Sequence, residues 1–347
     1  RIAGRLAEAI QLLEQSLAVL ARIAPTGLDT RPQSAFAFLQ LGHCYERQVM
    51  LTAGEEHYQQ ARMQYQALGD RWGEATAHLG LGEIAYRAGN YAQARQHHEA
   101  SLARFQALGD NRGRVIALER LGCILRDQGD LVAAEPLIGE AVALYEAFGD
   151  RAKIARGQLL LGALAMYAGD FHKAYPLIQK SVDLFEDLEL PGPRHSLGII
   201  HLELGEYAAA RLQLEAYIAQ ARRNNNQSAL AFSLGILACL ANVETRYAEA
   251  EQLATESLTI CQQTKQIERG IIATAHLGYA ARGLGKPAQA WSYFMTVLAW
   301  AVTQRGAVPL FFALAGIALL LADQGEIERA VELHARLTEQ PIAATSQ

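Results

Sequence analysis

The sequence predicts an all-α solenoid, in which helix pairs stack along one axis and each pair buries its apolar face against its neighbours. The string ALGD stands at residues 67–70 and 107–110, and AFGD stands at 147–150, so the three copies lie 40 residues apart. Glycines keep the same period at Gly89, Gly129 and Gly169. A Leu-Gly dipeptide precedes each of these glycines, with its glycine seven positions upstream. A fixed period of this length over most of a chain is typical of a repeat array.

Each periodic glycine marks the turn inside a helix pair. The series continues at Gly205, Gly285 and Gly325, and Thr245 fills the one slot without a glycine. The residue two positions after the turn is usually bulky, and the residue five positions after it is alanine. Because glycine readily adopts positive φ, it ends the first helix of the pair, and the bulky residue begins the second.

The small residue seven positions before each turn falls in the middle of a predicted first helix. Glycine there costs about 1 kcal/mol relative to alanine, so we expect a neighbouring helix to approach closely. In the sixth pair Leu234 and Gly235 are out of register, and Leu237 and Ala238 restore the 40-residue spacing. The glycines in register are Gly82, Gly122, Gly162, Gly198 and Gly278.

These patterns predict eight helix pairs and an N-terminal half-repeat. First helices are expected near 35–49, 72–88, 112–128, 152–168, 193–204, 227–243, 267–284 and 307–324. Second helices are expected near 52–68, 91–108, 131–148, 171–188, 207–223, 247–264, 287–304 and 327–338. Residues 1–23 match the second helix of a truncated repeat, and 25–32 is the longest predicted loop. Residues 1–340 are expected to form one solenoid, with a tail at 341–347.

Three features refine this outline. Asp70, Asp110 and Asp150 stand where helix N-caps are expected. Pro136 and Pro176 lie inside second helices, and we expect each to bend its helix. The string PGP at 191–193 marks a repeat that is four residues short, so its first helix should start at about residue 195. This segment forms either a kink or hinge in the superhelix, or a shortened loop that leaves the superhelix unchanged.

Composition excludes several function classes. The net charge of −5 and the dispersed arginines argue against nucleic acid and against an anionic membrane surface. No apolar run reaches the roughly 18–20 residues that a membrane span needs. The four cysteines form no CxxC motif and indicate a reducing, cytoplasmic location. The first residues show neither a starting Met nor a signal peptide, which favours a chain that begins inside a longer protein.

Catalytic motifs are not found. Residues 283–285 read GLG but fall on a repeat turn, and the Gly-Lys at 285–286 precedes proline where a phosphate-binding loop has Ser or Thr. HExxH and GxSxG motifs are missing from the sequence. We therefore expect no catalytic residues, no cofactor and no metal site, and we expect that the chain is not an enzyme.

The recurring pattern is a Leu-Gly dipeptide, a second glycine seven positions after the first, a bulky residue two positions further on and an alanine three positions after that. This pattern resembles the tetratricopeptide repeat (TPR). The usual period of that family is 34 residues, so a period of 40 implies helices longer by about one turn. The resemblance implies a right-handed superhelix whose concave face is lined by the first helices. Its binding positions lie six and three residues before the small mid-helix residue, and one, four and five after it.

Carried onto this chain, those positions give the candidate binding residues. They are Phe36, His43, Glu46, Arg47, Glu83, Tyr86, Arg87, Glu119, Arg126, Asp127, Arg156, Met166, Tyr167, His195, Glu203, Phe232, Asn242, Tyr279, Arg282 and Phe312. The same rule also yields positions that are mostly small or apolar, namely Leu39, Thr76, Leu79, Ile116, Cys123, Leu159, Ala163, Gly192, Ile199, Leu202, Gly235, Cys239, Val243, Ile272, Ala275, Gly283, Ala315, Leu319, Ala322 and Asp323.

The candidate face changes in character along the chain. Arg47, Arg87 and Arg126 recur near the ends of the first three first helices, whereas the positions from Met166 onward are more apolar. Such a surface suits a peptide or protein segment better than a small metabolite. The arginines either contact that partner or complement the negative C-termini of their own helices.

Forty-residue repeats with ALGD linkers, rich in Ala, Leu and Arg, resemble the C-terminal sensor arrays of bacterial signal-transduction ATPases of the STAND class, including maltose-regulator-like activators. This resemblance implies a bound protein or peptide trigger and a nucleotide-binding module upstream. A constitutive scaffold for protein assembly is the alternative, and an enzyme is a third. The Lys/Asn set that clamps a terminal carboxylate in short arrays of the family is missing from this sequence.

Overall fold

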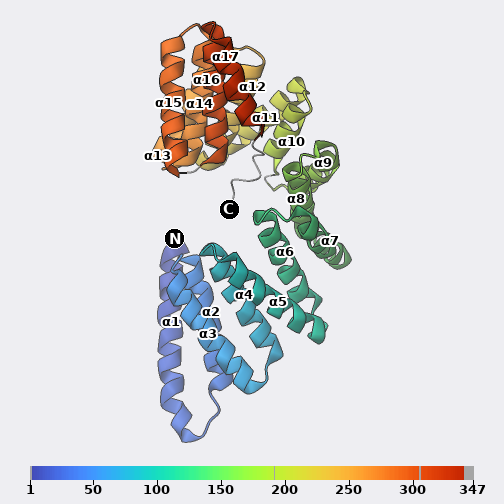
Figure 1. The fold of residues 1–347 in the computed structure, drawn as a ribbon. Helices are drawn as coiled ribbons and strands as arrows, with labels where there is room; N and C mark the ends of the chain where they lie inside the picture. The colour runs from blue at the N-terminus through green and yellow to red at the C-terminus, as the bar shows by residue number, and fades with distance from the viewer. Residues whose placement is uncertain (1, 191, 305, 340–347) are drawn as a thin grey trace. The chain divides into compact units, whose positions relative to one another are not determined.

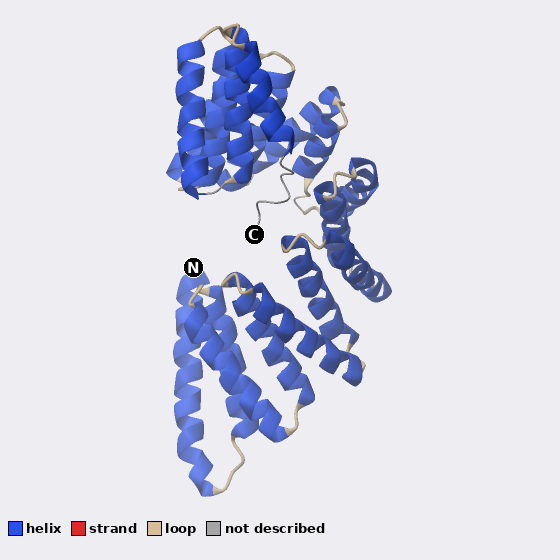
Figure 2. Cartoon of the chain, in the orientation of Figure 1, coloured by secondary structure: helices blue, strands red, loops and turns tan. Residues whose placement is uncertain are grey.

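The computed structural model describes residues 2–190, 192–304 and 306–339. These residues form seventeen α-helices, one short 3-10 helix and the turns between them, with no strand among them (Figure 2). The predicted all-α fold is confirmed. The helices group into two compact units, Arg1–Ala168 (unit 1) and Gly169–Gln347 (unit 2), and the boundary in sequence falls in the turn between α8 and α9.

In each unit, helices that follow one another in sequence lie side by side (Figure 1). Unit 1 contains α1 (Ile2–Ile23), η1 (Ala24–Thr26), α2 (Arg31–Arg47), α3 (Leu51–Leu68), α4 (Arg71–Arg87), α5 (Tyr91–Leu108), α6 (Asn111–Asp127), α7 (Leu131–Phe148) and α8 (Arg151–Tyr167). Unit 2 contains α9 (Phe171–Asp187), α10 (Arg194–Glu203), α11 (Tyr207–Arg223), α12 (Gln227–Val243), α13 (Tyr247–Gln263), α14 (Ile267–Gly283), α15 (Pro287–Gln304), α16 (Ala307–Asp323) and α17 (Ile327–Glu339).

The even-numbered helices from α2 are the predicted first helices, and the odd-numbered ones from α3 are the second. Most bounds agree with the prediction within one residue, and α1 matches the expected half-repeat. The first pair differs, because α2 begins at Arg31 instead of residue 35. Pro32 therefore stands in the first turn of α2, where its missing N–H is not needed, and the predicted loop is shortened further by η1.

The turns follow the predicted chemistry. Gly89, Gly129 and Gly169 all have positive φ, and Thr245, which replaces glycine in the sixth pair, has φ 60°. A β-branched residue is strained in this region. The carboxylates of Asp70, Asp110 and Asp150 accept N–H groups from the first turns of α4, α6 and α8, so the expected N-caps are confirmed.

The mid-helix glycines are points of close contact between the two helices of a pair. A Cβ at Gly122 would lie 2.4 Å from Ile138 Cγ1, and one at Gly198 would lie 2.6 Å from Leu214 Cγ. A Cβ at Gly235 would lie 3.7 Å from Ser257 Oγ, an ordinary contact distance, whereas Ala238 is fully buried. The register that assigns the small position to Ala238 is therefore confirmed.

Some second-helix side chains are enclosed from both sides. Phe294 of α15 is fully buried, with Gly278 of α14 on one side and Gly316 of α16 on the other. Tyr58 of α3 is enclosed in the same way between Gly42 and Gly80. One bulky side chain therefore joins two successive first helices, which is the packing unit of the stack.

Prolines lie inside two second helices and at the start of the short pair. Helices α7 and α9 continue through Pro136 and Pro176 without interruption. Helix α10 begins at Arg194, within one residue of the expected start of the short pair. The predicted hinge includes Pro191, which lies outside the described residues, as does the expected tail at 341–347.

Candidate functional site

The first helices of successive pairs lie against one another as well as against their own second helices. In unit 1, α2 contacts α4 and α4 contacts α6; in unit 2, α10, α12, α14 and α16 form a similar series. We call the surface formed by the predicted binding positions of these helices the first-helix face.

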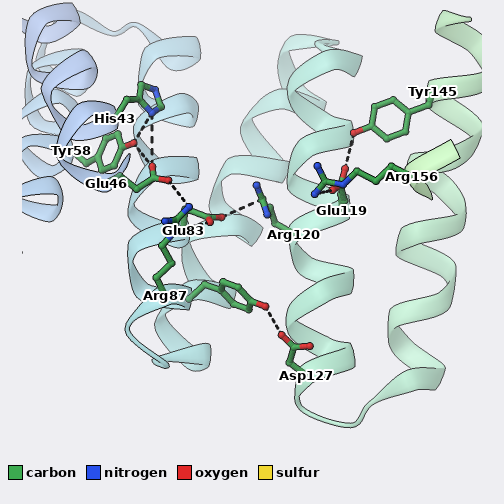
Figure 3. A network of polar contacts seen from close by, with 11 residues as sticks. His43, Glu46, Tyr58, Glu83, Arg87, Glu119, Arg120, Asp127, Tyr145 and Arg156 are labelled. Carbon is green, nitrogen blue, oxygen red and sulfur yellow. Dashed lines mark hydrogen bonds and ion pairs between the residues drawn. The ribbon is translucent and has the colours of Figure 1, made fainter. Parts of the chain in front are cut away.

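Glu46 on α2 is the centre of one polar group in unit 1 (Figure 3). The Tyr58 hydroxyl donates to Glu46 Oε2 at 2.7 Å, and His43 Nδ1 lies 2.6 Å from the same hydroxyl. Arg87 of α4 reaches across and pairs with Glu46 Oε1 at 3.3 Å. Burial, aided by the Glu46 carboxylate, raises the pKa of the Tyr58 phenol above its usual range. Burial lowers the pKa of His43, so its imidazole is neutral at pH 7.

The charge pattern continues onto the next first helix. Arg87 Nε donates to Glu83 Oε1 at 3.0 Å, and Glu83 Oε2 faces Arg120 Nε of α6 at 3.3 Å (Figure 3). Glu83 is thus placed between guanidinium groups from two helices. Opposite charges on successive first helices hold the repeats in register.

Glu119 of α6 forms the most deeply buried of these groups. Its side chain accepts from the Tyr145 hydroxyl at 2.8 Å and pairs with Arg156 of α8 at 2.7 Å (Figure 3). Glu119 is only 6% exposed, so the carboxylate depends on these two partners to offset its loss of hydration. Burial, together with the negative charge of Glu119, raises the pKa of Tyr145 above its usual range.

A third contact joins α4 to the end of α6. The Tyr86 hydroxyl donates to Asp127 Oδ2, and Arg126 Nε donates to Asp127 Oδ1 at 2.8 Å. Burial and the hydrogen bond to Asp127 raise the pKa of Tyr86 to about 12. The hydroxyl therefore stays protonated and serves as a donor over the physiological pH range.

Two of the three recurring arginines are paired with carboxylates of this chain. Arg87 contacts Glu46 and Glu83, and Arg126 contacts Asp127. Arg47 is exposed and has no ion-pair partner among the residues that the structure describes. Neither of the two roles proposed for the arginines from the sequence included this pairing. An anionic partner that uses Arg87 or Arg126 must compete with these carboxylates.

Unit 1 contains a cavity of about 230 Å³ with Arg126 in its wall. Tyr86, Cys123, Arg126 and Arg156 line it at predicted positions. The other lining residues are His98, Arg120, Ile124 and Leu160. His98 is 1% exposed, neither ring nitrogen has a hydrogen-bond partner, and burial lowers its pKa to about 3.

Unit 2 carries a cavity of different character between α12, α14 and α16. It has a volume of about 270 Å³. Seven of its nine lining residues occupy predicted binding positions, namely Cys239, Asn242, Val243, Tyr279, Arg282, Phe312 and Leu319. Tyr247 and His276 complete the wall. We call this cavity the unit 2 pocket.

Comparison with known proteins identifies the repeat. The sequence profile described as tetratricopeptide repeat matches residues 73–147. Residues 73–147 are therefore tetratricopeptide repeats, and the helix pairs on either side of them have the same arrangement. No curated protein matches its sequence.

Solved TPR-type structures share the fold of this array. The apo form of the quorum sensor NprR from B. thuringiensis superposes with a TM-score of 0.69 at 11% identity, covering 97% of this chain and 98% of that one. A STAND protein with a tetratricopeptide repeat sensor from Pyrococcus horikoshii gives a TM-score of 0.63 at 13% identity, covering 95% of this chain and 52% of that one. A Rap protein complexed with competence and sporulation factor gives 0.51 at 16% identity, covering 77% and 80%.

The other candidate residues of the TPR array are distributed along the first helices. His195 and Phe232 meet edge to face with ring centroids 5.6 Å apart, and Arg269 lies over the Phe232 ring. Burial lowers the pKa of His195 to about 4. Phe36, Tyr167 and Glu203 are exposed, Met166 is half-buried, and none of these four lines either cavity.

Sequence reasoning missed Arg120, His98, Tyr247 and His276. His98 and Tyr247 come from second helices, which the TPR positions do not include. His276 lies two residues before Gly278, and Arg120 lies two before Gly122. Adding the position two residues before the small residue to the set of binding positions would have identified both. Among the described residues, no group of three or more His, Cys, Asp or Glu side chains is placed to hold a metal ion. None of the described helices is long and apolar enough to cross a membrane.

Proposed function

We propose that residues 1–340 act as one binding array that takes a protein or peptide segment on the first-helix face. The observation that carries this proposal is the unit 2 pocket, because side chains from three successive first helices converge there. Repeat arrays present such extended surfaces to partners. The change from ion pairs in unit 1 to aromatic side chains in unit 2 suits a segment with polar and apolar parts.

We further propose that the array is the sensor of a larger cytoplasmic signalling protein of bacterial type. Support comes from the likeness to a TPR sensor in a STAND protein, of which this chain covers 52%. The quorum sensor NprR and a Rap protein in complex with its factor have the same fold. In this proposal an upstream nucleotide-binding module responds when the trigger favours one curvature of the array, and the shift is limited by the trigger's differential affinity for the two shapes.

Charge on the first-helix face provides the first test. Partners captured on the immobilised chain are purified and titrated calorimetrically at low and high salt against the wild type and the double variant Arg87→Ala/Arg126→Ala. The control, Arg95→Ala/Arg222→Ala, removes two arginines that are ion-paired on second helices. We expect weaker binding and a smaller salt dependence for the first variant only. Equal effects from both variants would contradict a role for the first-helix face.

The scaffold alternative differs from the sensor in its response to the partner. Small-angle scattering of the chain with and without the purified partner measures that response. After subtraction of the partner's own contribution, a changed profile supports the sensor. An unchanged profile favours the constitutive scaffold.

A further inference from the structure

The cavity in unit 1, which we call the unit 1 cavity, has a strongly basic wall formed by α4, α5, α6 and α8. Three of its eight described lining residues are the arginines Arg120, Arg126 and Arg156, and none of the eight is an aspartate or a glutamate. A guanidinium group is always charged and carries five N–H donors. The wall therefore brings together three positive charges from two first helices, α6 and α8.

A ligand can reach these arginines from solvent. The side chain of Arg156 is 47% exposed, and that of Arg120 is 36% exposed. Arg126 is more enclosed, with 21% of its side chain exposed. The guanidinium groups therefore stand at an accessible surface of the cavity, and binding there needs no contact with the packed interior of the helix pairs.

The carboxylates that pair with the arginines hold them in place but leave donors unused. Arg156 Nη2 lies 2.7 Å from Glu119 Oε1, and Arg120 Nε lies 3.3 Å from Glu83 Oε2 (Figure 3). The third arginine contacts the aspartate that follows it in sequence. Even a bidentate carboxylate uses only two of the five N–H donors of a guanidinium, so donors remain on each arginine for a ligand.

The other side chains of the wall add no charge near neutral pH. Burial lowers the pKa of His98 to about 3 and raises the pKa of the Cys123 thiol, so the imidazole and the thiol are both neutral. Tyr86 stays protonated, because its pKa is raised to about 12. Ile124 and Leu160 are apolar. The charge of the wall is therefore fixed between pH 5 and pH 7.

We propose that the unit 1 cavity binds a doubly charged tetrahedral anion, either free phosphate or the phosphoryl group of a small molecule, through Arg120, Arg126 and Arg156. A phosphoryl dianion has three terminal oxygens and a charge close to −2, so it can engage several guanidinium groups where a carboxylate offers two oxygens and one charge. The volume of about 230 Å³ lies below the roughly 300–1,000 Å³ of pockets for drug-sized ligands, so the ligand is compact. This site is additional to the proposed protein or peptide partner and does not depend on it.

Calorimetric titration of the full chain at constant ionic strength tests the chemistry of the ligand. The probes are inorganic phosphate, glycerol phosphate, sulfate and acetate. We expect the three tetrahedral anions to bind with dissociation constants of about 1 mM or below, and acetate to bind at least tenfold more weakly. Tighter binding of glycerol phosphate than of phosphate identifies a phosphate ester as the ligand, and the reverse order identifies free phosphate. Acetate that binds as tightly as the tetrahedral anions would overturn the proposal.

A pH comparison tests the requirement for two charges. The second pKa of a phosphate ester is about 6, so its doubly charged fraction falls about tenfold between pH 7 and pH 5. Sulfate keeps both charges at these two pH values and serves as the control. We expect glycerol phosphate to bind about tenfold more weakly at pH 5, while the affinity for sulfate changes by less than about twofold. Equal changes for the two anions would contradict a wall of fixed charge that selects a dianion.

Matched variants locate the site. Arg120→Gln removes one donor group from the wall, and Arg87 still pairs with Glu83. Arg95→Gln removes the same charge from an exposed pair with Glu99 on α5, outside the wall. We expect Arg120→Gln to weaken sulfate binding about tenfold and Arg95→Gln to weaken it less than about twofold. Circular dichroism melting curves show whether both variants are folded.

A conservative variant keeps the proposal falsifiable if Arg120→Gln does not fold. Arg156→Lys retains the positive charge beside Glu119 but removes the planar set of N–H donors, and it should weaken sulfate binding at least about threefold. If folded Arg120→Gln and Arg95→Gln have equal effects, or if Arg156→Lys binds sulfate as the wild type does, the chain holds an adventitious ion only and the proposal is overturned.

Discussion

Substitution of Gly278 by alanine tests the packing that defines the repeat. A Cβ at this position would lie 2.6, 2.8 and 2.9 Å from three atoms of the Phe294 ring. The ring cannot move away, because the Cα of Gly316 supports its other face, where a Cβ would come within 2.3 Å of the same ring. The glycine is therefore required by the close approach of the helices.

Two opposing effects determine the size of the change. Alanine stabilises a helix interior by about 1 kcal/mol relative to glycine. Overpacking a filled core costs about 1–3 kcal/mol, and a rigid ring enclosed on both faces favours the upper end. We expect Gly278→Ala to lower the free energy of unfolding by about 2 kcal/mol.

Urea titration followed by circular dichroism measures this difference. The matched control is Gly235→Ala in α12, where the new Cβ would lie 3.7 Å from Ser257 Oγ, and it should raise the stability by about 1 kcal/mol. The double variant Gly278→Ala/Phe294→Leu, measured against Phe294→Leu alone, should recover most of the loss. If Gly278→Ala is as stable as Gly235→Ala, the account of the small position is wrong.

Three further substitutions test other parts of the structure by the same urea titration. Thr245→Gly should stabilise the chain by about 1 kcal/mol, because it removes a β-branched residue from φ 60°; no gain would show that the turn is unstrained. His98→Ile should be at least as stable as the wild type at pH 7, and its free energy of unfolding relative to the wild type should be about 2 kcal/mol higher at pH 5 than at pH 7. The folded pKa of about 3 lies below the usual 6.5, so the wild type loses stability as the pH falls below 6.5; a constant difference between the two pH values would contradict this. Glu119→Ala should lower the free energy of unfolding by about 2 kcal/mol, because it leaves the buried Tyr145 hydroxyl without an acceptor. Glu99→Ala, at an exposed ion pair, should change it by less than about 0.5 kcal/mol. Equal losses would contradict the difference between a buried and an exposed carboxylate.

The fold could be predicted from the sequence because its main signals are local. A glycine with positive φ ends a helix wherever it stands, and an aspartate cap needs only the next three residues. The register at Ala238 followed from the period alone, although Leu234 and Gly235 offer a better local match. The start of α2 was missed because Pro32 is compatible both with a loop and with the first turn of a helix.

The candidate site was less predictable because its contacts cross between repeats. Glu46 and Arg87 lie 41 residues apart in sequence, and nothing in either repeat alone indicates that they pair. The arginines therefore looked like available cations until their partners were known. Asn242 was placed on the first-helix face, but its unpaired oxygen depends on the His276 carbonyl of the next pair.

The packing positions are restricted to small residues whereas the face positions are not, and this explains how one array can carry two chemistries. The small position holds Gly42, Gly278 or Ala238, because a second-helix side chain leaves no room for more. The residues four positions later, Glu46, Arg282 and Asn242, differ in charge and shape, and they contact their neighbours through polar groups at the ends of their side chains. A substitution there changes these polar contacts and the surface that the array presents, but it leaves the small residue on which the close packing depends. Ligand specificity can therefore vary between such arrays while the 40-residue period is retained.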